Sequence, residues 1–366
     1  MGFKALRFYQ FRNIIDTEIS LTDKDVYLVG ENGQGKTNFL EAIYLICYGS
    51  SFRTRNERNL IKHGHRDLSL SASFKDDKQQ IKILFKLEKG RKTIEIDGKK
   101  IRDRKELLSN FPCIAFTHDD INYVNGPPSE RRTFLNQTIS LYDPSYIDNL
   151  RIYNRLIKLR NRIIKEKNFS LLDIYDDQIA AAGFELVQKR RKLVDEFNST
   201  FTDLYNNISL ANMDLIIRYS PSWKNVNSVD DVLALLKSQR ERDIHFSTST
   251  SGPHRDRVGF FSDGRNFAET ASTGQIRLIS LVLKASQSAF IYKKSGKLPV
   301  LLLDDVLLEM DLEKRKRFLH YLPDYRQAFY TFLPDEGLIE FKNGGPIFTV
   351  KQGIITREES FCEKSS

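Results

Sequence analysis

The spacing of hydrophobic residues changes along the chain. Up to about residue 120, short runs alternate apolar and polar positions as half-buried strands do, and Lys92–Ile96 leads into an Asp97-Gly98 pair typical of hairpin turns. From Asp143 the apolar positions recur every three or four residues, with Asp143 suited to cap a helix and Pro144 to begin it. The helical spacing continues over residues 171–197. The pattern thus predicts strands followed by long helices.

Strand-like runs then return at Asp214–Tyr219, Val258–Phe261 and Leu298–Leu303. Strands, then helices, then strands predict an α/β protein built in two parts. We assign residues 1–120 and 255–366 to a β-rich head that combines a mixed or parallel sheet with an antiparallel part. Residues 121–254 form an inserted, mainly helical lobe, which leads into a further segment at 269–277.

The stretch VYLVGENGQGKTNFLEAI, residues 26–43, predicts a phosphate-binding loop between a buried strand and a helix. Its centre matches G-x-x-x-x-G-K-[ST] without a mismatch, which a chance glycine-rich turn with these flanks rarely does. Lys36 is placed to reach the β- and γ-phosphates of a nucleotide, and the Thr37 hydroxyl to bind Mg²⁺. The predicted nucleotide-contacting residues are Gly30, Glu31, Asn32, Gly33, Gln34, Gly35, Lys36 and Thr37.

Two acids follow the apolar run near the C-terminus. A buried parallel strand that ends in carboxylates places them at the sheet edge where ligands bind. Asp304 is the candidate Mg²⁺ ligand, and Asp305 is placed to polarise an attacking water. The alternative is that the two acids only cap the next helix, which would require the same residues.

A third motif, Ser-x-Gly-Gln, precedes an apolar helix and comprises Ser272, Gly274 and Gln275. A polar turn at a helix N-terminus is a second place where an anion could bind. Two such helix ends in one chain could each face one nucleotide across a dimer. The alternative is an ordinary capped core helix.

These motifs, in this order, resemble the ABC-type ATPase heads of the SMC and RecF group, and within it the RecF family. Four further stretches carry the resemblance to RecF: FRN at 11–13, SFRT at 51–54, RRTFL at 131–135 and GPHRD at 252–256. Together the motifs span residues 5 to about 331. Only 236 positions separate Lys36 from Ser272 (272 − 36), so the long coiled coil of SMC proteins has no room here.

The resemblance implies a weak, DNA-stimulated ATPase that uses ATP and Mg²⁺ in bacterial DNA repair, replication, recombination and the SOS response. Ser272 and Gly274 of a second subunit would close on the nucleotide held by the P-loop, so ATP would join a homodimer and hydrolysis would release it. Lys36, Asp305 and Thr331 would be catalytic, with Thr331 sensing the γ-phosphate. The family role is loading recombinase at gapped DNA with RecR- and RecO-type partners in the cytoplasm, at the nucleoid.

Charge favours a polyanionic partner as well, because the chain carries a formal charge of +9. Given an SMC-like head, a basic face on the helix near 151–167 and the cluster at 189–192 would contact single-stranded, gapped or duplex DNA through its phosphates. A solvated helix face is the alternative. The candidate DNA contacts are Arg151, Arg155, Lys158, Arg162, Lys189 and Arg190.

Some positions depart from the family pattern. Asn136 stands where Asp is common after Phe-Leu, and Leu308 replaces a small polar residue in the segment after the acid pair. The second departure motivates an alternative, a nucleotide-gated DNA clamp with vestigial hydrolysis. An ABC transporter ATPase subunit is a further alternative, although by resemblance to its members that class places its signature motif nearer the P-loop and needs a membrane partner. No run approaches the roughly 18 apolar residues that span a membrane.

Overall fold

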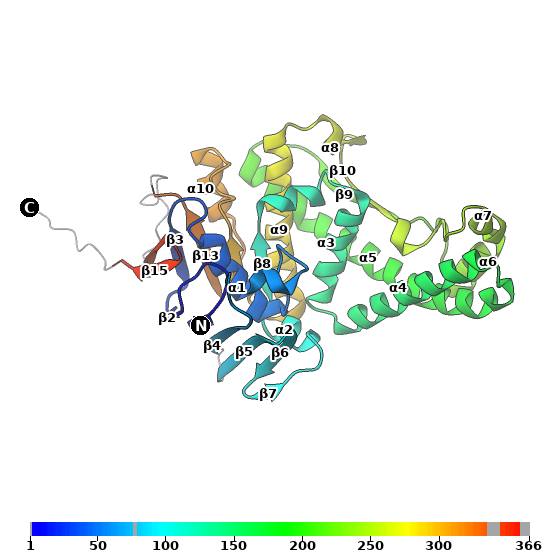
Figure 1. Cartoon of the computed structure of the whole chain (residues 1–366). Coiled ribbons are helices and arrows are strands. Elements are labelled where there is room, and N and C mark those ends of the chain that lie inside the picture. The colour runs from blue at the N-terminus through cyan, green and yellow to red at the C-terminus, as the bar shows by residue number, and fades with distance from the viewer. Residues whose placement is uncertain (1, 76–78, 335–344, 359–366) are drawn as a thin grey trace, which may run out of the picture. The chain divides into compact units, whose positions relative to one another are not determined.

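The computed structural model describes residues 2–75, 79–334 and 345–358, and the chain divides into two compact units (Figure 1). Unit 1 comprises Met1–His118 and Gln287–Ser366, and unit 2 comprises Asp119–Ser286. The inserted unit therefore ends later than the boundary at residue 254 that we predicted. The reason is strand pairing, because β10 (Arg257–Ser262) forms an antiparallel pair with β9 (Leu215–Ser220) inside unit 2.

The first sheet of unit 1 is mainly parallel, in the order β15-β14-β3-β13-β12-β8. Among its described strands only the β14–β15 pair is antiparallel, and all four residues of β12 are buried, as expected for strands covered on both faces. The strands predicted from residues 26–29 and 298–303 are confirmed, with β13 between them. The bounds are Asp25–Val29 (β3), Cys113–Phe116 (β8), Val300–Leu303 (β12), Gln327–Phe332 (β13), Ile347–Lys351 (β14) and Ile354–Arg357 (β15).

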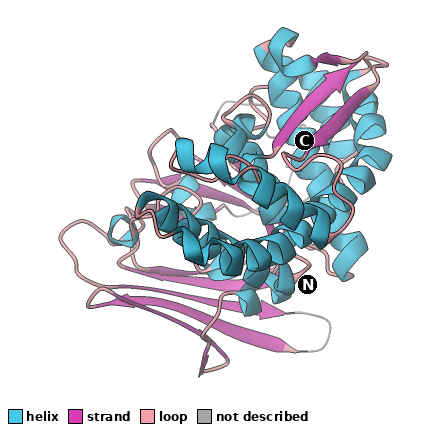
Figure 2. Ribbon diagram, turned by 90° about the vertical axis from the view of Figure 1, so that its right-hand side faces the viewer, coloured by secondary structure: helices cyan, strands magenta, loops and turns pink. Residues whose placement is uncertain are grey.

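The second sheet of unit 1 is antiparallel, in the order β2-β1-β4-β5-β6-β7, and appears as long magenta arrows in Figure 2. The predicted turn is confirmed, because Asp97 and Gly98 both have positive φ, 49° and 75°. Buried residues alternate along β4 and β5 and join one core with α1. The bounds are Gly2–Tyr9 (β1), Thr17–Ser20 (β2), Leu68–Lys75 (β4), Gln80–Glu88 (β5), Arg91–Ile96 (β6) and Lys99–Lys100 (β7).

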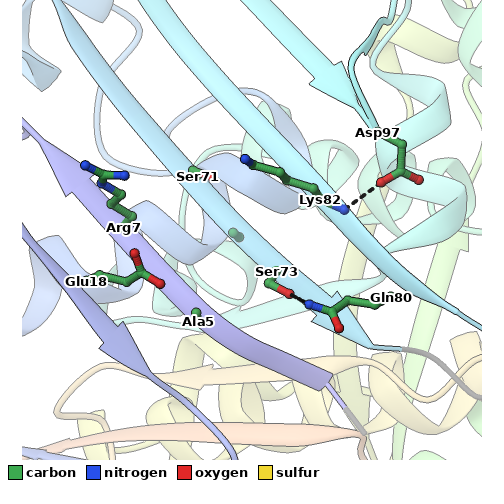
Figure 3. Close-up of a pocket in the computed structure, with 9 residues that line it drawn as sticks. Ala5, Arg7, Glu18, Ser71, Ser73, Gln80, Lys82 and Asp97 are labelled. Atoms are coloured by element: carbon green, nitrogen blue, oxygen red, sulfur yellow. Dashed lines mark hydrogen bonds between the residues drawn. The ribbon is translucent and has the colours of Figure 1, made fainter.

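The outer face of this sheet carries a shallow polar pocket of about 460 Å³ (Figure 3). Small side chains of β1 and β4, such as Ala5 and Ser71, form its floor, and Arg7, Glu18 and Lys82 line it. Because acids and bases balance there, the pocket has no preference for a polyanion. The helices of unit 1 are α1 (Lys36–Tyr48), η1 (Glu57–Leu60), α2 (Lys105–Asn110) and α10 (Leu312–His320).

Unit 2 is mainly helical and has one small sheet, in the order β11-β10-β9. Asp143 caps α4 as predicted, because its carboxylate accepts the N–H groups of Ser145 and Tyr146. The helices are η2 (His118–Tyr123), α3 (Pro128–Ser140), α4 (Pro144–Lys165), η3 (Phe169–Leu171), α5 (Leu172–Ser209), α6 (Val229–Ser238), α7 (Arg240–His245), η4 (Pro253–Arg255) and α8 (Phe267–Thr270), and β11 is Arg265–Asn266. Helix α9 (Thr273–Ser295) begins in unit 2 and ends in unit 1.

Trp223, the only tryptophan of the chain, is fully buried in unit 2. It packs against α5 at Gly183, where a Cβ would lie 2.4 Å from the indole ring. Any larger residue at position 183 would therefore push the indole out of place. Trp223 gives unit 2 a fluorescence signal of its own.

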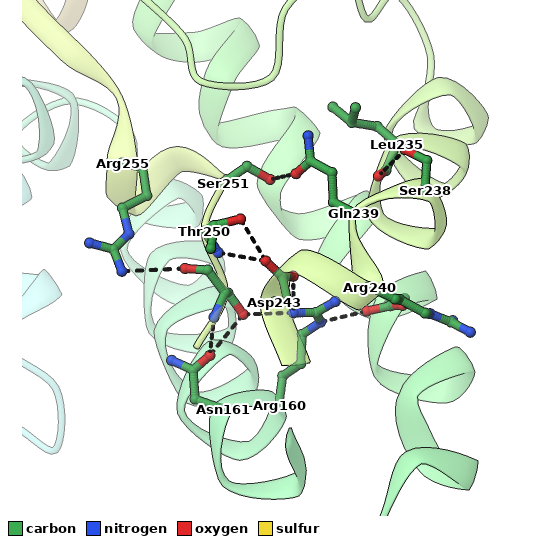
Figure 4. A network of polar contacts seen from close by, with 12 residues as sticks. Arg160, Asn161, Leu235, Ser238, Gln239, Arg240, Asp243, Thr250, Ser251 and Arg255 are labelled. Atoms are coloured by element: carbon green, nitrogen blue, oxygen red, sulfur yellow. Dashed lines mark hydrogen bonds and ion pairs between the residues drawn. The ribbon is translucent and has the colours of Figure 1, made fainter. Parts of the chain in front are cut away.

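Buried arginines hold the helices of unit 2 together. Arg160 of α4 is fully buried and binds Asp176 of α5 at 2.7 Å and Asp243 of α7 at 2.6 Å (Figure 4). Its guanidinium also donates to the hydroxyl of Ser249 at 2.9 Å. One side chain thus joins two helices and the segment before GPHRD to α4. Charged groups this deeply buried require such partners.

His254 of the GPHRD motif is a neutral residue held between two partners. Its Nε2 lies 3.2 Å from the Ser249 carbonyl, which can only accept, so Nε2 carries the proton and Nδ1 accepts the Tyr153 hydroxyl at 2.8 Å. Burial lowers the pKa of His254 to about 4, with a smaller lowering contribution from Arg255.

We expect this histidine to make unit 2 sensitive to acid. The depressed pKa means that the unfolded chain binds the proton more tightly, so the contribution of His254 is complete above pH 6.5 and is lost as the pH falls towards 4. The loss in unfolding free energy should reach about 3 kcal/mol. Urea titrations followed by Trp223 fluorescence at several pH values measure how the unfolding free energy depends on pH. The unfolding free energy of the His254→Asn variant should fall less between pH 6.5 and 4 than that of the wild type. Equal slopes in the two proteins would contradict the assignment.

Candidate nucleotide-binding site

The P-loop connects β3 to α1 and is folded around the Lys36 ammonium. Gly33 and Gly35 adopt positive φ values of 79° and 123°, which only glycine adopts without strain. Lys36 is 4 % exposed, and its Nζ donates to the Gly30 carbonyl at 2.6 Å and lies 3.8 Å from Asp305 Oδ2. The ammonium therefore points inward at the mouth of the loop, where it can exchange a carbonyl for phosphate oxygens.

Segments far away in the sequence hold the loop in shape. Asn13 of the FRN motif donates from Nδ2 to the Gly33 and Gln34 carbonyls at 3.3 and 3.2 Å. From the β14–β15 turn, the Gln352 N–H donates to Gln34 Oε1 at 2.6 Å. A Cβ at Gly30 would lie 2.3 Å from the Val350 carbonyl oxygen, so no larger residue fits there.

A buried carboxylate on α1 explains two of the family-like motifs. Glu41 is fully buried and accepts Nε and Nη2 of Arg12 at 2.9 and 2.8 Å. The Ser51 hydroxyl donates to the same carboxylate at 2.5 Å, and Arg53 lies 3.5 Å from it. FRN and SFRT therefore fix α1, whose N-terminus carries the P-loop. We did not predict this role for Glu41, although an acid within an apolar helix was the available signal.

Thr37 and Asp304 meet at the carboxyl end of β12. The Thr37 hydroxyl donates to Asp304 Oδ1 at 2.9 Å, which joins the P-loop to the acid pair 267 positions later. Burial raises the pKa of the Asp304 carboxyl above its usual range, and the hydroxyls of Thr37 and Thr331 oppose this. In the described part of the chain, no three His, Cys, Asp or Glu side chains gather as a metal site. One carboxylate and one hydroxyl suit Mg²⁺, which takes its other ligands from phosphates and water.

Asp305 is held in an unusual backbone conformation by Thr331. Its φ is 53°, a value that costs a non-glycine residue energy and persists only where the surroundings hold it. The Asp305 N–H donates to the Thr331 hydroxyl at 2.7 Å, and that hydroxyl lies 2.8 Å from Asp305 Oδ1. Thr331 is 2 % exposed, so it lies behind the acids and contacts them directly.

A second contact connects the segment after the acids to the end of β8. Nδ1 of His118 lies 2.8 Å from Oε1 of Glu309. Leu308, the departure from the family pattern, precedes this glutamate and is half-buried. The replacement therefore leaves the neighbouring polar contact in place.

The Ser-x-Gly-Gln motif begins α9 and lies in unit 2. The Ser272 N–H donates to Gln275 Oε1 at 2.8 Å, and the Gln275 N–H donates to the Ser272 hydroxyl at 3.3 Å, which is a capping box. Ser272, Gly274 and Gln275 are all exposed, and a Cβ at Gly274 would meet nothing. The capped-helix interpretation is thus correct for the local structure, and the motif also presents an open surface to another molecule.

The predicted DNA face is only partly available. Arg155 and Lys158 are exposed, but Arg151 pairs with Asp148 at 3.5 Å and Arg162 with Glu166 at 2.7 Å. Lys189 binds Asp143 and Glu185, both at 2.7 Å.

Arg190 was wrongly placed on this face, because it is buried with 2 % exposure. Its guanidinium binds Asp256 at 3.0 Å, the Pro253 carbonyl at 2.7 Å and Asn136 Oδ1 at 2.9 Å. It is therefore a core residue of unit 2 that fixes the GPHRD segment. The amide oxygen of Asn136 supplies the acceptor that an aspartate would supply, which accounts for that departure.

Comparison with known proteins decides the family. The model of the RecF/RecN/SMC N terminal domain matches residues 3–356. The DNA replication and repair protein RecF of Treponema pallidum is 45% identical over 337 residues, which cover 89% of this chain and 92% of that protein. The chain belongs to the RecF family. RecF of Leptospira interrogans serovar Lai is 32% identical over 364 residues, covering 97% and 99% of the two chains.

Solved structures agree with this assignment. The structure of the recombination mediator protein RecF-ATP in the RecFOR pathway has a TM-score of 0.88 and 27% identity, and covers 98% of both chains. The Smc head domain of Pyrococcus furiosus, with a TM-score of 0.57 and 17% identity, covers 98% of this chain and 96% of that chain and shares the fold. The predicted RecF-type ATPase head, with its mixed parallel and antiparallel sheets, is confirmed. In the described part of the chain no helix is long and apolar enough to cross a membrane.

Proposed function

We propose that this RecF-family protein is an ATP-dependent DNA-binding protein of replication, repair and recombination that hydrolyses ATP slowly. The carrying observation is the 2.9 Å hydrogen bond from Thr37 to Asp304, which brings the P-loop and the acid pair into one site. The RecF-ATP and RecF-ATPrS structures, each with a TM-score of 0.88, support ATP as the nucleotide.

Each site residue has a separate task in this proposal. The P-loop N–H groups and Lys36 bind the phosphates. Thr37 and Asp304 would hold Mg²⁺, which neutralises phosphate charge during the reaction. Asp305 accepts a proton from the attacking water, and Thr331 acts as a positioning residue that fixes the Asp305 carboxylate. This role replaces our expectation that Thr331 senses the γ-phosphate, because its hydroxyl is engaged by Asp305 at 2.7 and 2.8 Å.

The exposed start of α9 supports an ATP-dependent homodimer. Ser272 and Gly274 are exposed, and the polar turn they form can accept an anion once a second subunit brings one. ATP would then contact two chains and shift the population towards the dimer, and hydrolysis would reverse the shift.

Light scattering tests the two-subunit site. We expect ATP with Mg²⁺, but not ADP, to raise the mass of the wild-type protein from monomer to dimer. The Ser272→Arg variant should bind ATP with unchanged affinity and remain monomeric, because arginine fills the open turn. Tyr292→Arg, an exposed position on the same helix, is the control and should still dimerise. A Ser272→Arg dimer would show that the motif does not act across subunits.

The cellular role in this proposal is recombinase loading at gapped DNA in the bacterial cytoplasm, with RecR- and RecO-type partners. RecF relatives described as recombination mediators of the RecFOR pathway support it. Family membership removes the ABC transporter alternative. The nucleotide-gated DNA clamp with vestigial hydrolysis is the second candidate function, and Leu308 motivates it. Multiple turnovers of ATP in the presence of DNA would exclude it.

A further inference from the structure

A strongly basic hollow lies in unit 1, whereas the helix that we predicted as the DNA face belongs to unit 2. It has a volume of about 860 Å³ and is lined by η1, the loop that follows it, and the turn between β5 and β6. We name it the basic hollow after its five cationic side chains, Arg55, Arg58, Lys62, Arg66 and Lys89. His63 and His65 add two further hydrogen-bonding side chains to its wall.

The charge of the basic hollow is largely uncompensated. Glu57 is the one acid among its lining residues, and its carboxylate pairs with Lys92. Arg55, Arg58, Arg66 and Lys89 are exposed, and within the described residues their side chains make no hydrogen bond or ion pair. By contrast, Arg151, Arg162 and Lys189 on the helical face are each paired with an acid.

The backbone beneath these side chains is well anchored. Leu60 is 1 % exposed, and its carbonyl accepts the Arg12 N–H at 2.9 Å. The Lys62 N–H donates to the Gln10 carbonyl at 2.8 Å, and Ile61 forms a β-bridge with Phe11. The cations are therefore presented from a fixed scaffold, which lowers the entropic cost of ordering them on a ligand.

We propose that the basic hollow binds the phosphate backbone of duplex DNA. Several unpaired cations on a fixed surface match a ligand with regularly repeated negative charges. The lining contains no Phe, Tyr or Trp on which unpaired bases could stack, which favours duplex over single-stranded DNA. Contacts to phosphates position the protein without reading sequence. The inference rests on the proposed DNA-binding function and gives that function a surface.

The test uses the full chain with ATP and Mg²⁺ and a fluorescent duplex of about 30 base pairs at several salt concentrations. The Arg58→Gln/Arg66→Gln variant should bind roughly tenfold or more weakly at low salt. The slope of log K against log salt should be shallower by about two, because each phosphate contact contributes about 0.9. The matched control is Lys99→Gln/Lys100→Gln on β7, which also removes two exposed cations of unit 1 but lies outside the lining of the hollow, and it should keep a steeper slope. Arg155→Gln/Lys158→Gln on α4 tests the DNA face that we predicted first.

Unchanged melting temperature and ATP affinity would show that the variant is folded. An Arg58→Gln/Arg66→Gln variant with wild-type affinity and slope would overturn the inference. Loss of binding only in the α4 variant would move the DNA surface to α4 while leaving the proposed function intact. If the wild-type protein bound no duplex at all, the proposed function itself would fail. If the Arg58→Gln/Arg66→Gln variant bound DNA as the wild type does and instead lost binding to an acidic protein partner, the inference would also be overturned.

Discussion

Replacing Asp305 by asparagine should reduce ATP turnover by roughly 100-fold or more while ATP affinity stays the same. A general base contributes about 10² to 10⁴ to a rate, and an amide cannot take the proton of the attacking water. Asparagine keeps the size of the side chain and an oxygen for the Thr331 hydroxyl, now 2.8 Å from Oδ1. The phosphate-binding groups of the P-loop are left untouched.

Two further variants separate chemistry from positioning. Asp305→Glu keeps a carboxylate and should retain measurable turnover. Thr331→Ala removes the hydroxyl that holds the Asp305 N–H at 2.7 Å, so it should lower turnover less than Asp305→Asn does, and Thr331→Ser should restore it. A sensor of the γ-phosphate would instead weaken binding of ATP relative to ADP when removed.

Single-turnover phosphate release and equilibrium binding of a fluorescent ATP analogue measure the two quantities separately. The ATP-dependent dimer of Asp305→Asn should persist for longer than that of the wild type, because release is proposed to follow hydrolysis. Turnover near the wild-type rate in Asp305→Asn would remove Asp305 as the general base. Asp304 would then be the carboxylate left both to bind Mg²⁺ and to accept the proton of the attacking water.

The parts of the site that follow from local sequence were predictable. A strand, a glycine-rich loop and a helix start are adjacent in the chain, so G-x-x-x-x-G-K-T fixed the positions of Lys36 and Thr37. The acid pair was predictable because an apolar run that ends in two carboxylates is typical of a buried strand that presents ligands at the edge of a parallel sheet. Pairing the two motifs required only that both strands belong to one parallel sheet, and β13 lies between them.

What the sequence did not reveal depends on contacts between distant segments. Asn13 and Gln352 brace the P-loop at Gln34 across 21 and 318 positions, and nothing local marks them for that role. The domain boundary was misplaced for a similar reason. The β9–β10 pairing that places β10 in unit 2, which ends at Ser286, joins two distant segments, and neither segment reveals its partner by itself. Charge alone also could not separate Arg190 from its exposed neighbours, since burial depends on which side of α5 faces the core.

The largest effect on stability is expected for Arg190. Replacing it by methionine should lower the free energy of unfolding of unit 2 by about 3–5 kcal/mol, the usual cost of breaking a buried ion pair from one side. The change leaves Asp256, 1 % exposed, without its cation and leaves the Pro253 carbonyl without its 2.7 Å donor. Tyr219 and the Ser222 N–H still donate to the Asp256 carboxylate, which limits the loss.

Urea unfolding followed by the fluorescence of Trp223 measures this, because the only tryptophan of the chain is buried in unit 2. Lys189→Met, one residue earlier and partly exposed, should cost less than about 1 kcal/mol, as surface ion pairs do. Adding Asp256→Asn to Arg190→Met should recover part of the loss, since the unpaired charge is then removed. If Arg190→Met were as stable as the wild type and lost DNA affinity instead, the arginine would be a surface contact and the description of the unit 2 core would be wrong.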